Sequence, residues 1–199
     1  MKRILLPLLL LTVSAVAAAQ PKPHVVDAAH SQINFTAEAR FLSAPGFFGN
    51  WNSEIQLDPA KIENSNFKIT IDATSINTRN ERRDTHLKSK DFFDVATYPQ
   101  ITIVSKKITK TGDKAYNVTA DLTMHGVTKQ VDVPLTMVFY ENNRGRFRAR
   151  FTLNRKDYGI NYNSAMNPIQ DMVEVQVDIN VIDKEAADKA AAQRGQRPN

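Results

Sequence analysis

The chain has 199 residues, no cysteine, and a formal net charge of +5 from 26 basic and 21 acidic side chains. Without cysteine it has no disulfide, no thiol nucleophile, no thiolate metal site and no cysteine for lipid attachment after export. The charge excess is too weak to favour a nucleic-acid partner. It is compatible with an anionic head group or a membrane surface, although an ordinary solvated surface explains it better.

Residues 1–19 have the three-part pattern of a secretory signal peptide. A basic start at residues 1–3 precedes an apolar run at residues 4–13, and small residues follow at 17–19. A membrane anchor is the alternative, but a span needs about 20 apolar residues and this run is shorter. We therefore predict cleavage after Ala19. The exported, soluble protein then has 180 residues and a net charge of +3, since two basic residues leave, and it is long enough for one domain.

Most of the remaining chain alternates apolar and polar residues, as strands with one covered face do. The apolar positions are Ile33, Phe35 and Ala37; Phe67, Ile69, Ile71 and Ala73; Ile101 and Ile103; Val118, Ala120, Leu122 and Met124; Val131, Val133, Leu135, Met137 and Phe139; Phe147, Ala149, Phe151 and Leu153; Val173, Val175, Val177, Ile179 and Val181. About eight antiparallel strands of this kind need a closed barrel or two packed sheets to cover the apolar face. Periodicity alone does not choose between them.

An aromatic group interrupts this pattern near the start of the mature chain. It consists of Phe41, Phe47, Phe48 and Trp51, with glycines at 46 and 49. The group either closes the core at a strand corner or forms the lip of an apolar pocket, and we favour the corner.

One short helix is predicted near residues 81–89. Thr78 and Glu81 fit a capping box with Thr78 as N-cap. Asp84 and Lys88 have the spacing of an i,i+4 ion pair, and Pro99 ends the segment. The apolar residues expected to pack inward are Leu87, Phe92 and Phe93.

Basic residues gather on one face of this helix, at Arg79, Arg82, Arg83 and His86. Such a face fits a phosphate or pyrophosphate group. Ion pairing with acidic neighbours, or simple solvation, is the ordinary alternative, and we favour it.

The last residues differ from the strands before them. Residues 185–192 are rich in alanine and have a helical composition, whereas residues 193–199 are polar and contain glycine and proline. We therefore place the domain at residues 20–183 and treat residues 184–199 as a flexible tail.

No catalytic constellation is evident in the sequence. His24, His30, His86 and His125 are scattered without the spacing of metal ligands. No glycine-rich phosphate loop follows a strand, and no serine has the setting of a nucleophile elbow. We predict no enzyme, no metal and no cofactor.

Several segments carry distinctive residues in a fixed order. They are Asp27–Phe35; Asn80, Arg83-Asp84, His86-Leu87, Ser89 and Asp91–Asp94; Tyr98-Pro99, Ile101 and Ser105; Asp121–Thr123 and His125–Lys129; and Asn154-Arg155 with Asp157–Ile160. Together they resemble the signatures of the YceI-like family, from about residue 25 to residue 183. The family often has histidine near the end of the first strand, where this chain has Ala39, and the turn expected at residues 43–46 fits only loosely.

The resemblance implies an elongated, lipocalin-like antiparallel barrel with an apolar lumen. It also implies a periplasmic protein that binds an isoprenoid chain, such as polyprenyl phosphate or a quinone tail, and carries or stores it. The apolar lumen candidates are Phe35, Phe48, Trp51, Ile69, Ile71, Ile103, Leu122, Val133, Leu135, Phe147, Phe151, Val175 and Val177. The head-group candidates are Arg82, Arg83 and His86, and transient contact with a membrane surface is an open alternative.

Two other functions remain open. An enzyme acting on a lipid or quinone would need an acid–base pair in the lumen, and the apolar strand faces supply none. A structural or interaction protein, in contrast, would have a barrel filled by its own side chains. The sequence leaves the oligomeric state, the chain length of the ligand and its head group undetermined.

Overall fold

The computed structural model describes residues 20–195, so the predicted signal peptide lies outside the described residues. The elements in chain order are β1 (Lys22–Val26), β2 (Gln32–Ala39), β3 (Leu42–Phe48), β4 (Trp51–Leu57), β5 (Asn66–Asp72), β6 (Ile76–Asn77), α1 (Glu81–Lys88), β7 (Gln100–Lys110), β8 (Ala115–Met124), β9 (Val127–Glu141), β10 (Arg144–Asn154), β11 (Ile169–Asp183) and α2 (Lys184–Gly195). No helix within this range is both long and apolar enough to cross a membrane.

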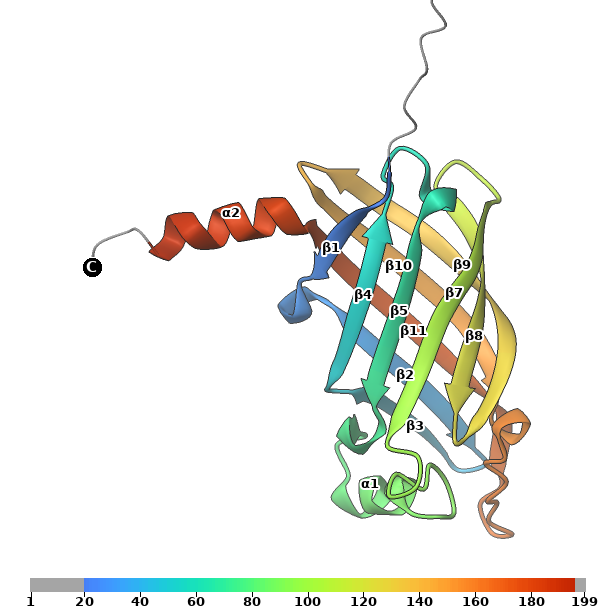
Figure 1. The fold of residues 1–199 in the computed structure, drawn as a ribbon. Helices are drawn as coiled ribbons and strands as arrows, with labels where there is room; N and C mark the ends of the chain where they lie inside the picture. The colour runs from blue at the N-terminus through green and yellow to red at the C-terminus, as the bar shows by residue number, and fades with distance from the viewer. Residues whose placement is uncertain (1–19, 196–199) are drawn as a thin grey trace, which may run out of the picture.

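Eight of the strands close into an antiparallel barrel, which confirms the predicted fold class. The ring runs β1-β4-β5-β7-β8-β9-β10-β11, and β1 closes it by pairing with both β4 and β11 (Figure 1). In this closure His24 lies opposite Ile55 on one side and Asp183 on the other. A closed ring removes the unpaired edges that an open sheet of this size would expose.

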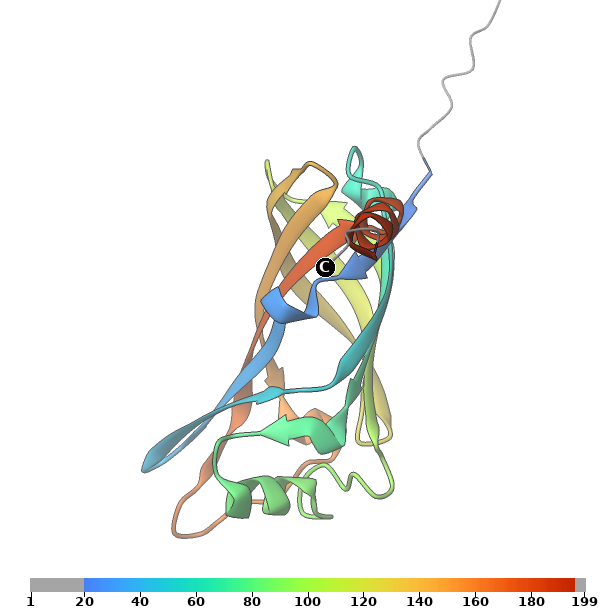
Figure 2. The ribbon, with the colours of Figure 1, turned by 90° about the vertical axis from the view of Figure 1, so that its left-hand side faces the viewer.

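The remaining strands form a branch on this barrel. The long strand β11 pairs with β1 near its end but with β2 along its first part, from Ile169 to Asp178. From there the sheet continues through β3 to the short β6. Among the described residues β3 and β4 do not pair, so the hydrogen-bonded sheet is interrupted between them (Figure 2).

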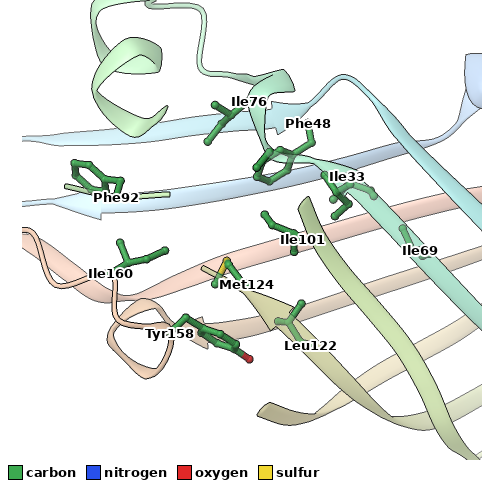
Figure 3. Packing of buried hydrophobic residues seen from close by; sticks show 12 residues of the cluster. Ile33, Phe48, Ile69, Ile76, Phe92, Ile101, Leu122, Met124, Tyr158 and Ile160 are labelled. Carbon is green, nitrogen blue, oxygen red and sulfur yellow. The ribbon is translucent and has the colours of Figure 1, made fainter. Parts of the chain in front are cut away.

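Two apolar clusters occupy the barrel interior, as the alternating pattern predicts. The α1-end cluster includes Ile33, Phe48, Ile101, Met124 and Tyr158 (Figure 3). The far-end cluster, at the end where β1 begins, includes Leu57, Ile108, Val118, Phe147 and Val181. Val118 and Val181 are 1% and 2% exposed, and burying a side chain of this kind contributes about 1.5–3 kcal/mol.

The expected alternation is wrong at one position of β9. Arg146 lies opposite Phe139, whereas the next residue, Phe147, lies opposite Met137. Strand β9 therefore contains one extra residue between these two pairs, which is a β-bulge. The bulge moves Phe139 off the inward face. Tyr140 packs against the far-end cluster instead.

The turn expected at residues 43–46 is also wrong, because these residues lie within strand β3. Pro45 and Gly46 are typical of turns, which is why the sequence did not indicate a strand here. The strand pairing explains the glycine. Gly46 lies opposite Phe35 in the pairing of β2 with β3, and a Cβ at Gly46 would collide with the Phe35 ring. The ring therefore covers the glycine, and the strand needs that residue to be small.

Helix α1 covers the end of the barrel opposite the start of β1 (Figure 1). Its N-cap is Asn80, whose side chain accepts a hydrogen bond from the Arg83 amide, so the prediction of Thr78 as N-cap is wrong. Thr78 is buried instead, and its hydroxyl donates to Asp84. The predicted inward packing of Leu87, Phe92 and Phe93 is confirmed, since all three belong to the α1-end cluster or pack against it.

Helix α2 follows β11 directly and extends away from the barrel (Figure 1). The alanine-rich stretch is helical as its composition indicates, and the helix begins one residue earlier and ends three residues later than the stretch itself. Flexibility of residues 184–199 stays a prediction, because a helix that leaves the barrel is compatible with it.

Candidate ligand-binding site

A cavity of about 250 Å³ runs inside the barrel, and the surface facing it is apolar. We call this cavity the lumen. Twelve of the thirteen apolar site candidates line it: Phe35, Phe48, Ile69, Ile71, Ile103, Leu122, Val133, Leu135, Phe147, Phe151, Val175 and Val177. They come from six strands of the ring and from β2 and β3, because inward positions recur at every second residue of each strand. That these residues bind a ligand stays a prediction.

Other residues of the lumen wall were not among the candidates. Some lie on the same strand faces, such as Ile108, Ala149 and Ile179. The alternating pattern includes Ala149 and Ile179, although neither was chosen as a ligand-binding candidate. Others, such as Phe92 and Ile160, come from the segments around α1 and after β10. Those segments lack strand alternation, so the pattern did not identify them as part of a lumen wall, although Phe92 was expected to pack inward.

Trp51, the thirteenth candidate, borders a different space. A second cavity of about 890 Å³ lies where β3 and β4 do not pair, and we call it the side opening. Its lining comes from β1, β2, β3, β4 and residues 77–79, with Gln176 of β11. Trp51 also packs against both apolar clusters. The residue therefore stands between the barrel interior and the side opening.

One buried guanidinium fixes the chain at the α1 end of the lumen. Arg155 is 5% exposed, and it donates hydrogen bonds to the carbonyl oxygens of Ile160 at 2.8 Å and Tyr162 at 2.7 Å. It also donates to the carbonyls of Ile169 and Gln170, and it contacts the Asp171 carboxylate at 3.3 Å. These bonds tie the loop after β10 to the start of β11, so that Ile160 and Ile169 face the lumen.

The three head-group candidates do not border either cavity. Arg83 folds back on Thr78, donating to its hydroxyl at 2.8 Å and to its carbonyl at 2.9 Å. His86 contacts the Asp91 carboxylate at 2.8 Å and lies edge-on to Phe92 and Tyr162. Arg82 is exposed on α1. Arg79 was expected on the same helical face, but it precedes the helix and has a φ of 60°.

Two further ionisable groups lie near the cavities: Tyr158 in the α1-end cluster and His24 in the wall of the side opening described above. Burial raises the pKa of Tyr158 to about 12, so the phenol stays protonated, and its hydroxyl has no hydrogen-bond partner among the described residues. His24 is 4% exposed, and its ring nitrogens contact the Lys22 carbonyl and the Tyr140 hydroxyl, each at 2.9 Å. In residues 20–195 no three histidine, aspartate or glutamate side chains are placed to hold a metal ion.

A charged cluster lies on the outer face of β10 and β11. Hydrogen bonds from Arg146, and secondarily from Arg148, lower the pKa of Asp178 despite its partial burial. A lowered pKa stabilises the fold above the ordinary range of aspartate, and this contribution is lost as the pH falls through the lowered value. The cluster therefore supports the β10–β11 pairing and takes no part in the lumen.

Comparison with known proteins agrees with this architecture. A sequence profile described as a YceI-like domain matches residues 24–181. A UPF0312 protein of Pseudomonas syringae pv. tomato is 40% identical over 124 residues, which cover 58% of this chain and 62% of that protein. A UPF0312 protein of Vibrio parahaemolyticus is 32% identical over 123 residues, covering 60% and 65%. The chain thus spans less than two thirds of the length of these relatives.

Solved structures have the same fold. BcnA of Burkholderia cenocepacia superposes with a TM-score of 0.73 at 27% identity, over 78% of this chain and 98% of BcnA. The YCEI protein of Campylobacter jejuni gives 0.60 at 26% identity, over 70% and 86%. A domain from Saccharophagus degradans, described as polyisoprenoid-binding, gives 0.65 at 18% identity, over 81% and 99%.

Proposed function

The chain belongs to the YceI-like family, and on that premise we propose that it binds an isoprenoid lipid in its lumen and serves as a carrier or store for it. The observation that carries the proposal is the apolar lumen itself, which runs along the barrel between the two clusters. The structural neighbour described as polyisoprenoid-binding has the same fold. It suggests which class of lipid to test first.

The proposed mechanism is burial without chemistry. A prenyl tail in the lumen leaves water and contacts the inward side chains of the strands. Burying on the order of 600 Å² of tail at about 25 cal/mol/Å² gives roughly 15 kcal/mol before the costs of ordering. This margin supports tight binding without an ion pair. Polyprenyl phosphates and prenylated quinones both have such a tail.

The lumen wall favours binding over catalysis. Arg155 is the single ionisable residue among those that line it within the described chain, and its guanidinium already binds backbone carbonyls. An enzyme would need an acid and a base at the reacting atoms.

Mass spectrometry of organic extracts from the purified protein tests the proposal. A prenyl lipid that copurifies in stoichiometric amount supports it. Turnover of an added prenyl lipid or quinone would replace the carrier by an enzyme. An empty extract, together with no uptake of added prenyl lipid, would leave a barrel with a structural or interaction role.

We further propose that the protein works in the periplasm after export. The support is the signal-peptide pattern of residues 1–19. N-terminal sequencing of the protein from a periplasmic fraction is expected to begin at Gln20. A chain that retains Met1 in the membrane fraction would overturn this proposal.

We also propose that one end of the barrel touches the membrane from which the lipid comes. Phe41, Leu42 and Met166 are 72%, 44% and 85% exposed. The turn after β2 is joined to the loop before β11, since the Phe41 amide donates to the Asn167 side chain at 3.1 Å. The Arg40 guanidinium lies 5.1 Å from the centre of the Phe41 ring. Exposed apolar side chains beside a cation suit the interface of an anionic bilayer.

Removing these apolar groups is expected to weaken membrane binding. The double variant Phe41→Ser, Met166→Ser should bind anionic phospholipid vesicles about a hundredfold or more weakly, because each of the two lost insertions removes about 1.5 kcal/mol or more of apolar transfer. Cosedimentation with vesicles measures the change. The matched control Phe41→Leu, Met166→Leu keeps the apolar surface and should bind as the parent does. Equal binding by the serine variant would place membrane contact elsewhere.

A further inference from the structure

The side opening between β1, β2, β3 and β4 has the chemistry of a site for an anionic head group. We propose that it receives the phosphate of a prenyl phosphate whose tail lies in the lumen, with the Arg79 guanidinium as the counter-charge. This inference rests on the proposed function, because the tail in the lumen brings the head group to the opening.

The opening is a consequence of strand pairing. Strand β2 follows β1 in the chain but pairs with β11. Strand β3 then pairs with β2 and β6 but not with β4 (Figure 2). The space left between them is about 890 Å³, larger than the lumen at about 250 Å³. A head group that is too polar for the lumen therefore has room beside it.

The side opening and the lumen share part of their walls. Asn34, Phe35 and Phe48 border both cavities. The Phe35 and Phe48 rings are tilted against one another with centroids 5.6 Å apart, and Trp51 lines the opening close to them. These aromatic rings stand between the polar opening and the apolar lumen, so a lipid that reaches both cavities has its tail on the lumen side of the rings and its head group on the other side.

The charge of the opening favours an anion. Arg79 is its one lysine or arginine, and no aspartate or glutamate lines it among the described residues. Arg79 is exposed and forms no ion pair within residues 20–195. His24 also lines the opening, with its ring nitrogens in contact with the Lys22 carbonyl and the Tyr140 hydroxyl. The remaining polar lining includes the amides of Asn52, Asn77 and Gln176. These can donate hydrogen bonds to phosphate oxygens around a guanidinium.

The backbone holds Arg79 in place beside the opening. Its amide donates to the Asn77 side chain at 2.8 Å, and the neighbouring Thr78 is fixed by Asp84 and Arg83. The φ of 60° is in the left-handed region, which a residue with a long side chain seldom adopts.

Two ligands that have the same tail and different head groups distinguish binding at the side opening from binding in the lumen. Isothermal titration calorimetry with farnesyl phosphate and farnesol measures how much the phosphate adds to affinity. For the parent protein we expect farnesyl phosphate to bind about five- to tenfold more tightly, as for a charge-assisted contact at a partly exposed site. Arg79→Gln should remove this preference while farnesol binds unchanged. Trp51 is the sole tryptophan, and its fluorescence should respond to the phosphate ligand more than to the alcohol.

Arg82→Gln is the matched control, because Arg82 is an exposed arginine close in sequence that does not border the opening. It should keep the full preference for the phosphate, and Arg79→Lys should keep part of it. The inference is overturned if Arg79→Gln retains the preference, if Arg82→Gln loses it equally, or if the parent shows none. If neither ligand binds the parent protein, the proposed function fails as well, which is a different result.

Discussion

Val175→Trp is expected to reduce the uptake of a fluorescent prenyl analogue by more than tenfold, with little change in the thermal midpoint of the lipid-free protein. Val175 is half-buried on the inward face of β11 and lines the lumen. An indole at this position occupies space that the tail would use. Leu135→Trp, on β9, is expected to act in the same way. The measurements are retention of the analogue and thermal unfolding of delipidated protein.

A fully buried position that is packed within the far-end cluster and does not line the lumen provides the control. Ala120 is 0% exposed and is absent from the lumen wall. Added volume in a filled core costs about 1–3 kcal/mol, so Ala120→Val should lower the midpoint by several degrees and leave uptake in the folded protein unchanged. If Val175→Trp and Leu135→Trp destabilise the lipid-free protein as strongly, the barrel is filled, and the carrier proposal loses its physical basis.

Arg155→Met is expected to cost about 3–5 kcal/mol of unfolding free energy, the range for removing one partner of a buried charged network. The substitution leaves the carbonyls of Ile160 and Tyr162 without their donor inside the protein. For a domain of this size the midpoint should fall by about 10 °C. Denaturant unfolding measures the free energy.

Lys156→Met is the comparison for this variant. Lys156 is exposed and binds the same Asp171 carboxylate at 2.9 Å. A surface ion pair contributes about 1 kcal/mol or less, so the two neighbouring substitutions should differ several-fold in cost. Equal small losses would mean that water satisfies the loop carbonyls when the guanidinium is removed.

The barrel could be predicted from sequence because its long strands repeat one simple pattern. From β7 to β11 the apolar residues alternate, and the register of each pair places them on one face. The pattern failed where the spacing changed, since the extra residue in β9 puts Phe139 outside and Tyr140 inside. A bulge leaves no mark on composition, so the partner strand alone reveals it.

The site was less predictable than the fold. Alternation identified most of the lumen wall, but the side opening arises from β3 and β4 failing to pair, a long-range property that local pattern does not encode. Gly46 and Pro45 indicated a turn, yet both lie in a strand, where the Phe35 ring leaves no room for a side chain at position 46. The basic residues near α1 were recognised as a group, whereas the separation of Arg79 from Arg83 depends on the true N-cap, Asn80.

The closure of the barrel by its first and last strands places both ends of the barrel domain at the same end of the barrel. Because His24 lies opposite Asp183, the two ends of the barrel domain emerge side by side, at the end away from α1 (Figure 1). A tether on either terminus therefore holds the barrel by the same end and leaves Phe41 and Met166 free at the other. Surfaces for single-molecule or biosensor work can be loaded through α2 in one orientation, with the proposed membrane-contacting residues Phe41 and Met166 presented to vesicles in solution.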